Sequence, residues 1–442
     1  MTTSSTAAPR KPVAKHVPLV MYEEDEIIVA QQHERVLRRL LKDKDVEVGH
    51  AESSDVLGLA KLRLTNLTDA EARLAPTEIS TLLRGEEEKE ALAEWQLVHP
   101  RPNSDVPIDQ ILWALRAVFA ARCSGWTPTL GKNRFVGQVH GVGEVIHGGG
   151  GDPQAVDKAD INPFAAKARD TAPGSGVRVG VLDTGIHSHA WLAGSWTAGI
   201  DDTVTSPADS FADGHATFIT GLVLSQAPGA TVRVRKVLEN GTANSWDVAK
   251  AIVEFGNSGL DVLNLSFACY TEDGEQPMAL AAAIDRLDPN LVVVAAAGNH
   301  GEAGKEDGFT KADNDKPAYP AAFDDVIAVG AANDDGKRAS FSPNGWWLDL
   351  NAPGDKVTST YLPEVKPGKG GSTIKFRDSF ARWSGTSFAA ALVTGAVAAK
   401  IEPGHKTGRQ AVREIFDSLA SPSGEPDLGS PEPPFLKLWP PS

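Results

Sequence analysis

Continuous apolar runs alternate with helical patterns through the second half of the chain. Five short runs have the uninterrupted apolar character of strands buried on both faces, at 177–182, 232–237, 262–265, 291–295 and 326–329. Segments with helical spacing lie between and after these runs, near 215–225, 245–257, 277–286, 388–400 and 408–420. This alternation predicts an α/β fold, a three-layer doubly wound structure whose mostly parallel sheet is covered by helices on both faces.

The first half of the chain has a different pattern, which predicts a small α+β unit. Its predicted strands are 26–30, 59–64 and 95–98, with one or two more in 134–146. Its predicted helices are 31–43, a charged stretch at 69–94 that is interrupted at Pro76, and 108–119. In the first of these helices, one face carries Val36, Leu37, Leu40 and Leu41.

A glycine run separates the two halves. The sequence HGGGGDP at 147–153 is typical of a flexible joint. We therefore expect a flexible tail at 1–20, the α+β unit at 21–147, a Gly-rich linker at 148–174, the α/β domain at 175–420 and a Pro-rich C-terminal tail at 421–442.

Composition narrows the classes of partner. A net charge of −15 and a pI near 5.2 argue against nucleic acid or an anionic membrane as the main partner. Cys123 and Cys269 are the two cysteines, which is too few for a disulfide framework or a metal cluster. No apolar run approaches the roughly 18 residues of a membrane span, and 17–21 is shorter than a signal-peptide core of about 7–15 residues. The expectation is a cytoplasmic protein, with non-classical release as the alternative.

The stretch 383–391, WSGTSFAAA, carries the first candidate for chemistry. Ser387 follows Gly385 and opens a helix that is apolar on nearly every face up to 398, so this helix is expected to be buried. The start of a buried helix offers backbone N–H groups and a positive dipole end to developing negative charge. Gly-Thr-Ser triplets also occur in ordinary turns and helix N-caps, so the stretch alone does not establish catalysis.

Three further polar residues stand at strand ends or helix starts. Asp183 ends the first apolar run, His215 follows a glycine and starts an apolar helix, and Asn299 follows a buried strand. Taken singly, Asp183 is read as a turn cap, His215 as a core or cap histidine, and Asn299 as a turn former. Taken with Ser387, they form a reaction set. Serine attacks a carbonyl, histidine takes and returns its proton, and aspartate orients the imidazole. Asn299 and the Ser387 backbone N–H would donate to the oxyanion.

Four motifs in this order carry a family resemblance. They are VLDTG at 181–185, GHAT at 214–217, AAGN at 296–299 and SGTS at 384–387. With them the chain resembles the subtilisin-like serine protease family, the subtilases, over about 175–400. The resemblance implies a serine endopeptidase that forms an acyl-enzyme, with Asp183, His215 and Ser387 as triad and Asn299 as oxyanion donor. Its substrate would be a polypeptide or a peptide precursor.

The resemblance also implies a specificity pocket. Its walls would be Ser266, Phe267 and Ala268 on one side and Ala296, Ala297 and Gly298 on the other, with Ala318 near its base. Backbone groups of such walls pair with an extended peptide as an added strand. The lining is small and apolar, so an uncharged side chain is expected before the cut, although His300 is expected at the rim.

Departures from the family pattern bear on metal binding and packing. Ala216 replaces a usual Gly, Phe218 a common second His, and Phe388 a Met. The short segment 221–229 lacks the loop that holds calcium in many relatives, so no metal and no cofactor are expected. Two inserts remain open. The acidic 302–315 is a solvated loop or an ion site, and 361–378 is a hairpin near the cleft.

In this family, an α+β unit before the catalytic domain resembles an inhibitory prodomain. The chain's own N-terminal domain would then act as an intramolecular inhibitor of an autoprocessed zymogen. The segment 143–151 would enter the active site, with cleavage near the glycine run. A permanent docking domain that is never removed is the alternative.

Two rival functions are weighed on the same residues. A Ser-Glu-Asp acid peptidase would carry Glu in place of His215. A non-proteolytic scaffold on this fold has no chemical need for Asp183, His215 and Ser387 together.

Overall fold

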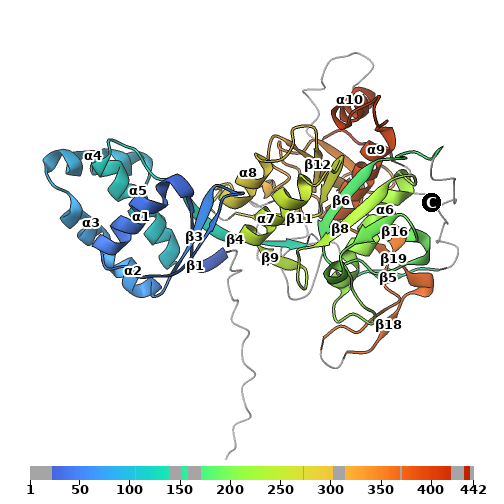
Figure 1. Cartoon of the computed structure of the whole chain (residues 1–442), viewed down its shortest axis with the longest axis horizontal. Helices are drawn as coiled ribbons and strands as arrows, with labels where there is room; N and C mark the ends of the chain where they lie inside the picture. The colour runs from blue at the N-terminus through green and yellow to red at the C-terminus, as the bar shows by residue number, and fades with distance from the viewer. Residues whose placement is uncertain are drawn as a thin grey trace, which may run out of the picture.

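A computed structural model describes residues 22–104, 106–138, 151–157, 171–271, 273–301, 314–368, 371–419 and 433–438. A smaller N-terminal unit of helices and a short sheet lies beside a larger α/β body (Figure 1). Each has its own cluster of buried apolar side chains. The predicted fold class, an α/β body preceded by an α+β unit, is confirmed.

The α/β body is built on a parallel sheet of seven strands. In spatial order they are β15 (Leu350–Pro353), β14 (Val326–Ala332), β12 (Val292–Ala296), β10 (Val262–Leu265), β6 (Arg178–Asp183), β8 (Thr231–Lys236) and β7 (Trp196–Ala198). Every neighbouring pair is parallel. The predicted apolar runs all lie in this sheet. β7 and β15 were not predicted, because their short sequences, WTA and LNAP, are not continuous apolar runs.

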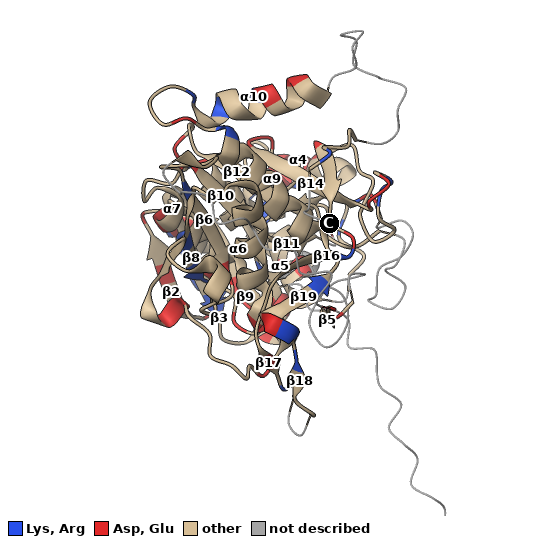
Figure 2. Cartoon of the chain, turned by 90° about the vertical axis from the view of Figure 1, so that its right-hand side faces the viewer, with Lys and Arg blue, Asp and Glu red and all other residues tan. Residues whose placement is uncertain are grey.

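Helices cover both faces of this sheet. They are α6 (His215–Gln226), α7 (Ser245–Gly256), α8 (Met278–Ile284), α9 (Thr386–Lys400) and α10 (Gly408–Leu419). In α6 and α9 nearly every residue is buried, and Figure 2 shows both helices almost without charge. The two pack against each other, whereas α7 and α8 lie toward the N-terminal unit (Figure 1). Because α6 and α9 carry almost no charge and lie inside the body, polar residues on these helices can be kept away from water.

The N-terminal unit packs helices on an antiparallel sheet in the order β4-β1-β3-β2. Its elements are β1 (Tyr22–Ala30), α1 (Gln31–Asp43), β2 (Val48–Ser54), β3 (Leu59–Leu64), α2 (Leu67–Arg73), α3 (Pro76–Leu82), α4 (Glu86–Val98), α5 (Pro107–Arg122) and β4 (Leu130–Gln138). Its core includes Leu37, Leu62 and Ile111, all fully buried. The predicted α+β character is therefore observed.

Three local predictions in this unit are wrong. Residues 95–98 are the last turn of α4 rather than a strand, because the Glu- and Ala-rich segment before them continues the helix. Val36 is 42% exposed although Leu40, one turn later on the same side of the helix, is buried, so the buried face is narrower at the start of α1. β2 was missed because its sequence VGHAESS is polar and most of its side chains are at least partly exposed.

A hairpin in the insert 361–378 is confirmed, and short strand pairings also occur in segments that were predicted as a linker and a tail. Within the insert 361–378, β17 (Glu364–Val365) pairs with β18 (Ile374–Lys375) as an antiparallel hairpin. Within the predicted linker, β5 (Gln154–Ala155) pairs with β19 (Phe380–Trp383). Near the C-terminus, Phe435 forms a bridge with Asn351. Most of the acidic insert 302–315 and of the stretch 139–150 lies outside the described residues.

β4 joins the two parts of the molecule. It pairs with β1 inside the N-terminal unit and then continues into the α/β body. There it pairs antiparallel with β9 (Thr242–Asn244) on one side and β11 (Phe267–Tyr270) on the other. β11 in turn pairs with β13 (Ala318–Tyr319). One sheet therefore runs through both parts (Figure 1).

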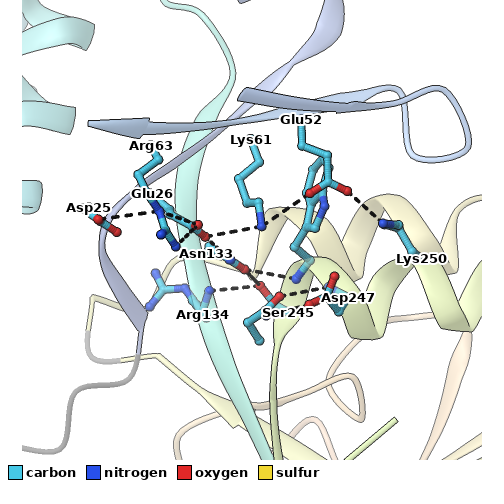
Figure 3. Close-up of polar contacts among 12 residues, drawn as sticks. Asp25, Glu26, Glu52, Lys61, Arg63, Asn133, Arg134, Ser245, Asp247 and Lys250 are labelled. Atoms are coloured by element: carbon cyan, nitrogen blue, oxygen red, sulfur yellow. Dashed lines mark hydrogen bonds and ion pairs between the residues drawn. The ribbon is translucent and has the colours of Figure 1, made fainter. Parts of the chain in front are cut away.

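Polar side chains lock this junction (Figure 3). Asn133 of β4 donates to Glu26 at 2.6 Å, and its Oδ1 accepts from the Ser245 hydroxyl and the Trp246 backbone N–H, both at 3.0 Å. β4 thereby caps the start of α7 from outside.

A second contact joins β2 to α7. Glu52 accepts from Lys250 Nζ at 2.8 Å and lies 3.6 Å from Lys61 Nζ. Burial opposes ionisation of Glu52, but the hydrogen bond from Lys250 and the charges of Lys250 and Lys61 outweigh it and lower its pKa to about 2.

The Glu52 contact predicts an acid-sensitive part of the stability. The pKa of Glu52 in the folded protein lies below its usual value of 4.5, so its contribution is present above about pH 4.5 and is lost as the pH falls toward 2. Replacing Glu52 by Gln should lower the melting temperature at pH 7 by roughly 1–2 °C, because the pair is partly exposed. It should also reduce the further loss between pH 4.5 and pH 2.5. Thermal melts of the full chain measure both, with Glu94→Gln on α4 as control. An unchanged acid sensitivity would contradict the assignment.

Candidate active site

Four of the predicted residues lie where strands of the parallel sheet end and helices begin. Asp183 is the last residue of β6, His215 is the first of α6, and Ser387 is the second of α9. Asn299 follows the end of β12 by three residues. All four are fully buried. The fold therefore brings polar groups from distant parts of the chain into its interior.

Asp183 holds the imidazole of His215. Both carboxylate oxygens lie 2.9 Å from His215 Nδ1. Asp183 Oδ1 also accepts from the backbone N–H of Thr184 at 2.6 Å and from its hydroxyl at 3.2 Å, so the carboxylate is itself held in place. A carboxylate facing Nδ1 favours the tautomer with its proton on Nδ1, which makes Nε2 the nitrogen that can accept one.

The hydroxyl of Ser387 is held by the strand beside it. Ser387 Oγ donates to the carbonyl oxygen of Ser266 at 3.1 Å. Ser266 Oγ lies 3.1 Å from the carbonyl oxygen of Ser387 and 2.8 Å from Asn264 Oδ1. Asn264 Nδ2 in turn donates to Thr394 Oγ1 at 3.0 Å. These bonds tie β10 to α9 around the nucleophile candidate.

Aromatic rings surround the imidazole. His215 lies 5.7 Å from Trp383 and 5.6 Å from Phe388 between ring centroids, and Phe388 directly follows Ser387. Phe218 and Phe388 contact each other at 4.5 Å. Two of the departures from the family pattern therefore pack together and form an apolar wall beside His215.

The amide of Asn299 has a defined orientation. Its Oδ1 accepts from the Thr386 backbone N–H at 3.0 Å and lies 3.2 Å from the Thr386 hydroxyl, which directs the Nδ2 end away from Thr386. Gly298 precedes it with φ at +93°, and a Cβ there would stand 2.4 Å from the Tyr270 hydroxyl. Glycine is therefore required at 298 for this placement of Asn299.

The predicted pocket residues lie on neighbouring strands. Phe267 and Ala268 begin β11 and Ser266 directly precedes it, whereas Ala296 ends β12 and Ala297 and Gly298 follow it. Ala318 belongs to β13 and is paired with Tyr270 of β11. The assignment of these residues to a specificity pocket stays a prediction.

The expected place of His300 is wrong. It is fully buried rather than at a rim, and its Nε2 lies 2.9 Å from the carbonyl oxygen of Lys316. Its ring stacks on Trp347 at 6.5 Å and meets Tyr270 edge-on at 4.8 Å. His300 therefore belongs to the interior packing behind Gly298.

The groove between β9 and β11 holds a segment of the chain itself. Gly137 is opposite both Thr242 of β9 and Ala268 of β11, and Gln138 is opposite Phe267. The residue before Phe267 is Ser266, whose carbonyl oxygen accepts from Ser387 Oγ. β4 therefore runs toward the nucleophile candidate as an extended peptide.

Sequence reasoning missed this segment. The pairing of 135–138 with β9 and β11 was not predicted. The predicted entering tail, 143–151, lies outside the described residues except for Gly151, so it stays a prediction. Val136 is fully buried in the core of the α/β body. The feature of the sequence that could have identified this segment is the apolar pair Phe135-Val136, which directly follows three polar residues.

The next described segment of the chain begins at Gly151 and contacts the strand that leads into α9. The carbonyl oxygen of Gly151 accepts from Trp383 Nε1 at 2.7 Å. Gln154 and Ala155 then pair with Arg382 and Ala381 of β19, the strand that leads into α9. The segment that ends at Gln138 and the segment that begins at Gly151 therefore both contact elements next to Ser387.

The described residues bear on metal binding and on membrane insertion. Among them, no group of three or more His, Cys, Asp and Glu side chains is arranged to hold a metal ion. None of their helices has the length and apolar character needed to cross a membrane. The link from α6 to β8 is short, since α6 ends at Gln226 and β8 begins at Thr231.

Sequence comparison finds similar proteins for the α/β body. The family model described as "Subtilase family" matches residues 174–418. Subtilisin Savinase from Lederbergia lenta is 32% identical over 265 residues, which cover 58% of this chain and 87% of that protein. The alkaline protease of Alkalihalobacillus alcalophilus is 32% identical over 265 residues, which cover 58% of this chain and 62% of that protein.

A comparison with solved structures finds a likeness that extends further. The crystal structure of fervidolysin from Fervidobacterium pennivorans, described as a keratinolytic enzyme related to subtilisin, matches with a TM-score of 0.54 at 19% identity. The match covers 91% of this chain and 58% of that one. At this identity it is a likeness of fold, and it reaches beyond the residues that the family model matches.

The hydrogen bonds behind Ser387 predict a stability effect. Replacing Thr394 by Val removes the acceptor of the buried Asn264 amide, which should lower the free energy of unfolding by about 1–3 kcal/mol. Thr394→Ser keeps the hydroxyl and should lose less. Urea denaturation of both variants measures the difference. If Thr394→Val loses no more stability than Thr394→Ser, the hydrogen bond is not what stabilises this position.

Proposed function

We propose that this chain cleaves its substrates through an acyl-enzyme. The premise is that the chain belongs to the subtilase family and is a subtilisin-like serine endopeptidase acting on peptide or protein substrates. The residues proposed to act are Ser387, His215, Asp183 and Asn299. The observation that carries the proposal is the pair of 2.9 Å contacts between Asp183 and His215 Nδ1 at the start of α6. They orient the imidazole at a helix that packs on α9, which bears Ser387.

The first half of the proposed reaction forms the acyl-enzyme. Ser387 Oγ attacks the carbonyl carbon of the substrate while its proton passes to His215 Nε2, and Asp183 stabilises the imidazolium. The oxyanion accepts from Asn299 Nδ2 and the Ser387 backbone N–H, at the start of a buried helix. The C–N bond then breaks, and the amine leaves with the proton from His215.

The second half returns the enzyme. Water attacks the acyl carbonyl and gives its proton to His215, the C–O bond to Ser387 breaks, and the His215 proton returns to Ser387 Oγ. The rings of Trp383 and Phe388 lie beside the imidazole and limit the access of water to it. These side chains supply every proton transfer in the sequence, so the proposed reaction needs no cofactor.

The N-terminal unit is proposed to inhibit the enzyme until the chain cleaves itself. Support comes from β4, whose residues 135–138 pair with β9 and β11 and so occupy the edges that an extended substrate would use. The described chain approaches Ser387 from one side at Gln138 and is held again at Gly151. The bond cut in processing is proposed to lie between these two residues.

A serine-directed fluorophosphonate tests the nucleophile. Wild-type protein should be labelled, Ser387→Ala should not, and peptide hydrolysis should fall by roughly 10⁴-fold or more in the variant. Ser384→Ala is the matched control, because this nearby serine bonds Asp355 and is proposed to have no part in the reaction. Labelling that survives in Ser387→Ala, or disappears in Ser384→Ala, would refute the assignment.

Intact mass tests self-processing. Purified wild-type protein should contain a fragment whose first residue lies between 139 and 151, whereas Ser387→Ala should stay full length. The register of β4 supplies the lower limit and the contact of Gly151 with Trp383 the upper one. If both proteins stay full length while the wild type is active, the N-terminal unit is a permanent docking domain.

A further inference from the structure

The groove that holds β4 ends in an acidic contact on the side away from Ser387. β11 runs from Phe267, next to the nucleophile candidate, to Tyr270, and Asp273 follows shortly after it. Both carboxylate oxygens of Asp273 lie 2.7 Å from Arg134 Nη2. Asp273 Oδ2 is also 3.0 Å from Lys132 Nζ. Both cations belong to β4, the strand that occupies the groove.

This contact joins a buried cation to a partly exposed carboxylate. The Arg134 side chain is 2% exposed and that of Asp273 is 27% exposed. Burial opposes ionisation of Asp273, but the charges of Arg134 and Lys132 outweigh it and lower its pKa. The pair favours a cationic side chain over a neutral one at this position, because a neutral side chain leaves the carboxylate without its opposite charge.

We propose that Asp273 is a specificity-determining residue, which selects substrates carrying Arg four residues before the residue that pairs with Phe267. This inference rests on the proposed function, since it takes β4 as the pattern for a bound substrate. β4 carries the antiparallel pairing expected of a bound peptide. A substrate in the same register presents to Asp273 the side chain that corresponds to Arg134.

The alternation of β4 supports the same placement. Residues 134 and 136 lie on one face of the strand, because side chains alternate along it. Val136 enters the core of the α/β body and Arg134 reaches Asp273. A peptide in this groove therefore meets an apolar site first and an acidic site two residues further upstream.

The neighbouring contacts show which position discriminates. Lys132 shares its charge with Asp109 of the N-terminal unit at 2.6 Å, so its contact depends partly on that unit. Glu275 bonds Arg116 of α5 at 2.7 and 3.1 Å and makes its contact with the unit rather than with β4. A bound substrate takes the place of β4 and has no counterpart of α5 or of the rest of the N-terminal unit. Asp273 should therefore discriminate among substrates, and Glu275 should not.

The experiment compares two internally quenched peptides that carry the sequence of residues 128–146, one unchanged and one with Arg134→Gln. Each is offered to the full chain as purified, to Asp273→Asn and to Glu275→Gln. The wild type should cleave the unchanged peptide with about tenfold higher kcat/KM than its Gln form. Asp273→Asn should reduce this ratio to about twofold or less. Glu275→Gln, the matched control on the same loop, should keep the wild-type ratio.

Each other result has a meaning. Equal kcat/KM for the two peptides in the wild type, or a preference that persists in Asp273→Asn, overturns the inference. The same holds if the wild type reacts with fluorophosphonate at Ser387 and degrades casein but cleaves neither peptide. If it neither reacts nor degrades casein, the proposed function itself has failed. Melting curves confirm that the variants are folded before their ratios are compared.

Discussion

The backbone edges of β9 and β11 impose the constraint on which the rest of the structure depends. Buried N–H and C=O groups must find partners, and β4 supplies them to both strands at once. The N-terminal sheet is thereby continuous with strands of the α/β body. In the proposed function, a substrate uses these same backbone groups. Inhibition and recognition then compete for one set of hydrogen bonds, so removal of β4 is what opens the groove.

Side chains keep β4 in a single register. Val136 is buried in the core of the α/β body, Asn133 caps α7, and Arg134 meets Asp273. A slip by one residue would turn Val136 toward the other face and separate both polar contacts. Backbone pairing alone is tolerant of such slips. The apolar and charged contacts together therefore determine which residue follows the strand toward Ser387.

The candidate active site combines polar groups with an apolar shell. Asp183 follows a stretch of β6 that is buried and uncharged from Val179 to Leu182, and His215 begins a helix that is buried and uncharged through Leu224. The rings of Phe218, Phe388 and Trp383 pack around the imidazole, and two of them depart from the family pattern. Because Phe218 and Phe388 contact each other, these two departures form one packing unit and leave the Asp183–His215 contact in place.

The amino-acid sequence by itself determined the parallel strands, the main helices and the set Asp183, His215, Asn299 and Ser387. Long apolar runs and short motifs are local properties, and they can be read without knowing what lies nearby. Only the tertiary structure decided the burial of His300, the helical end of α4 at 95–98 and the course of β4. Arg134 and Asp273 are 139 positions apart, and their pairing depends on the register of β4 in the groove. No local pattern contains that register, because it results from the packing of one part of the chain against another.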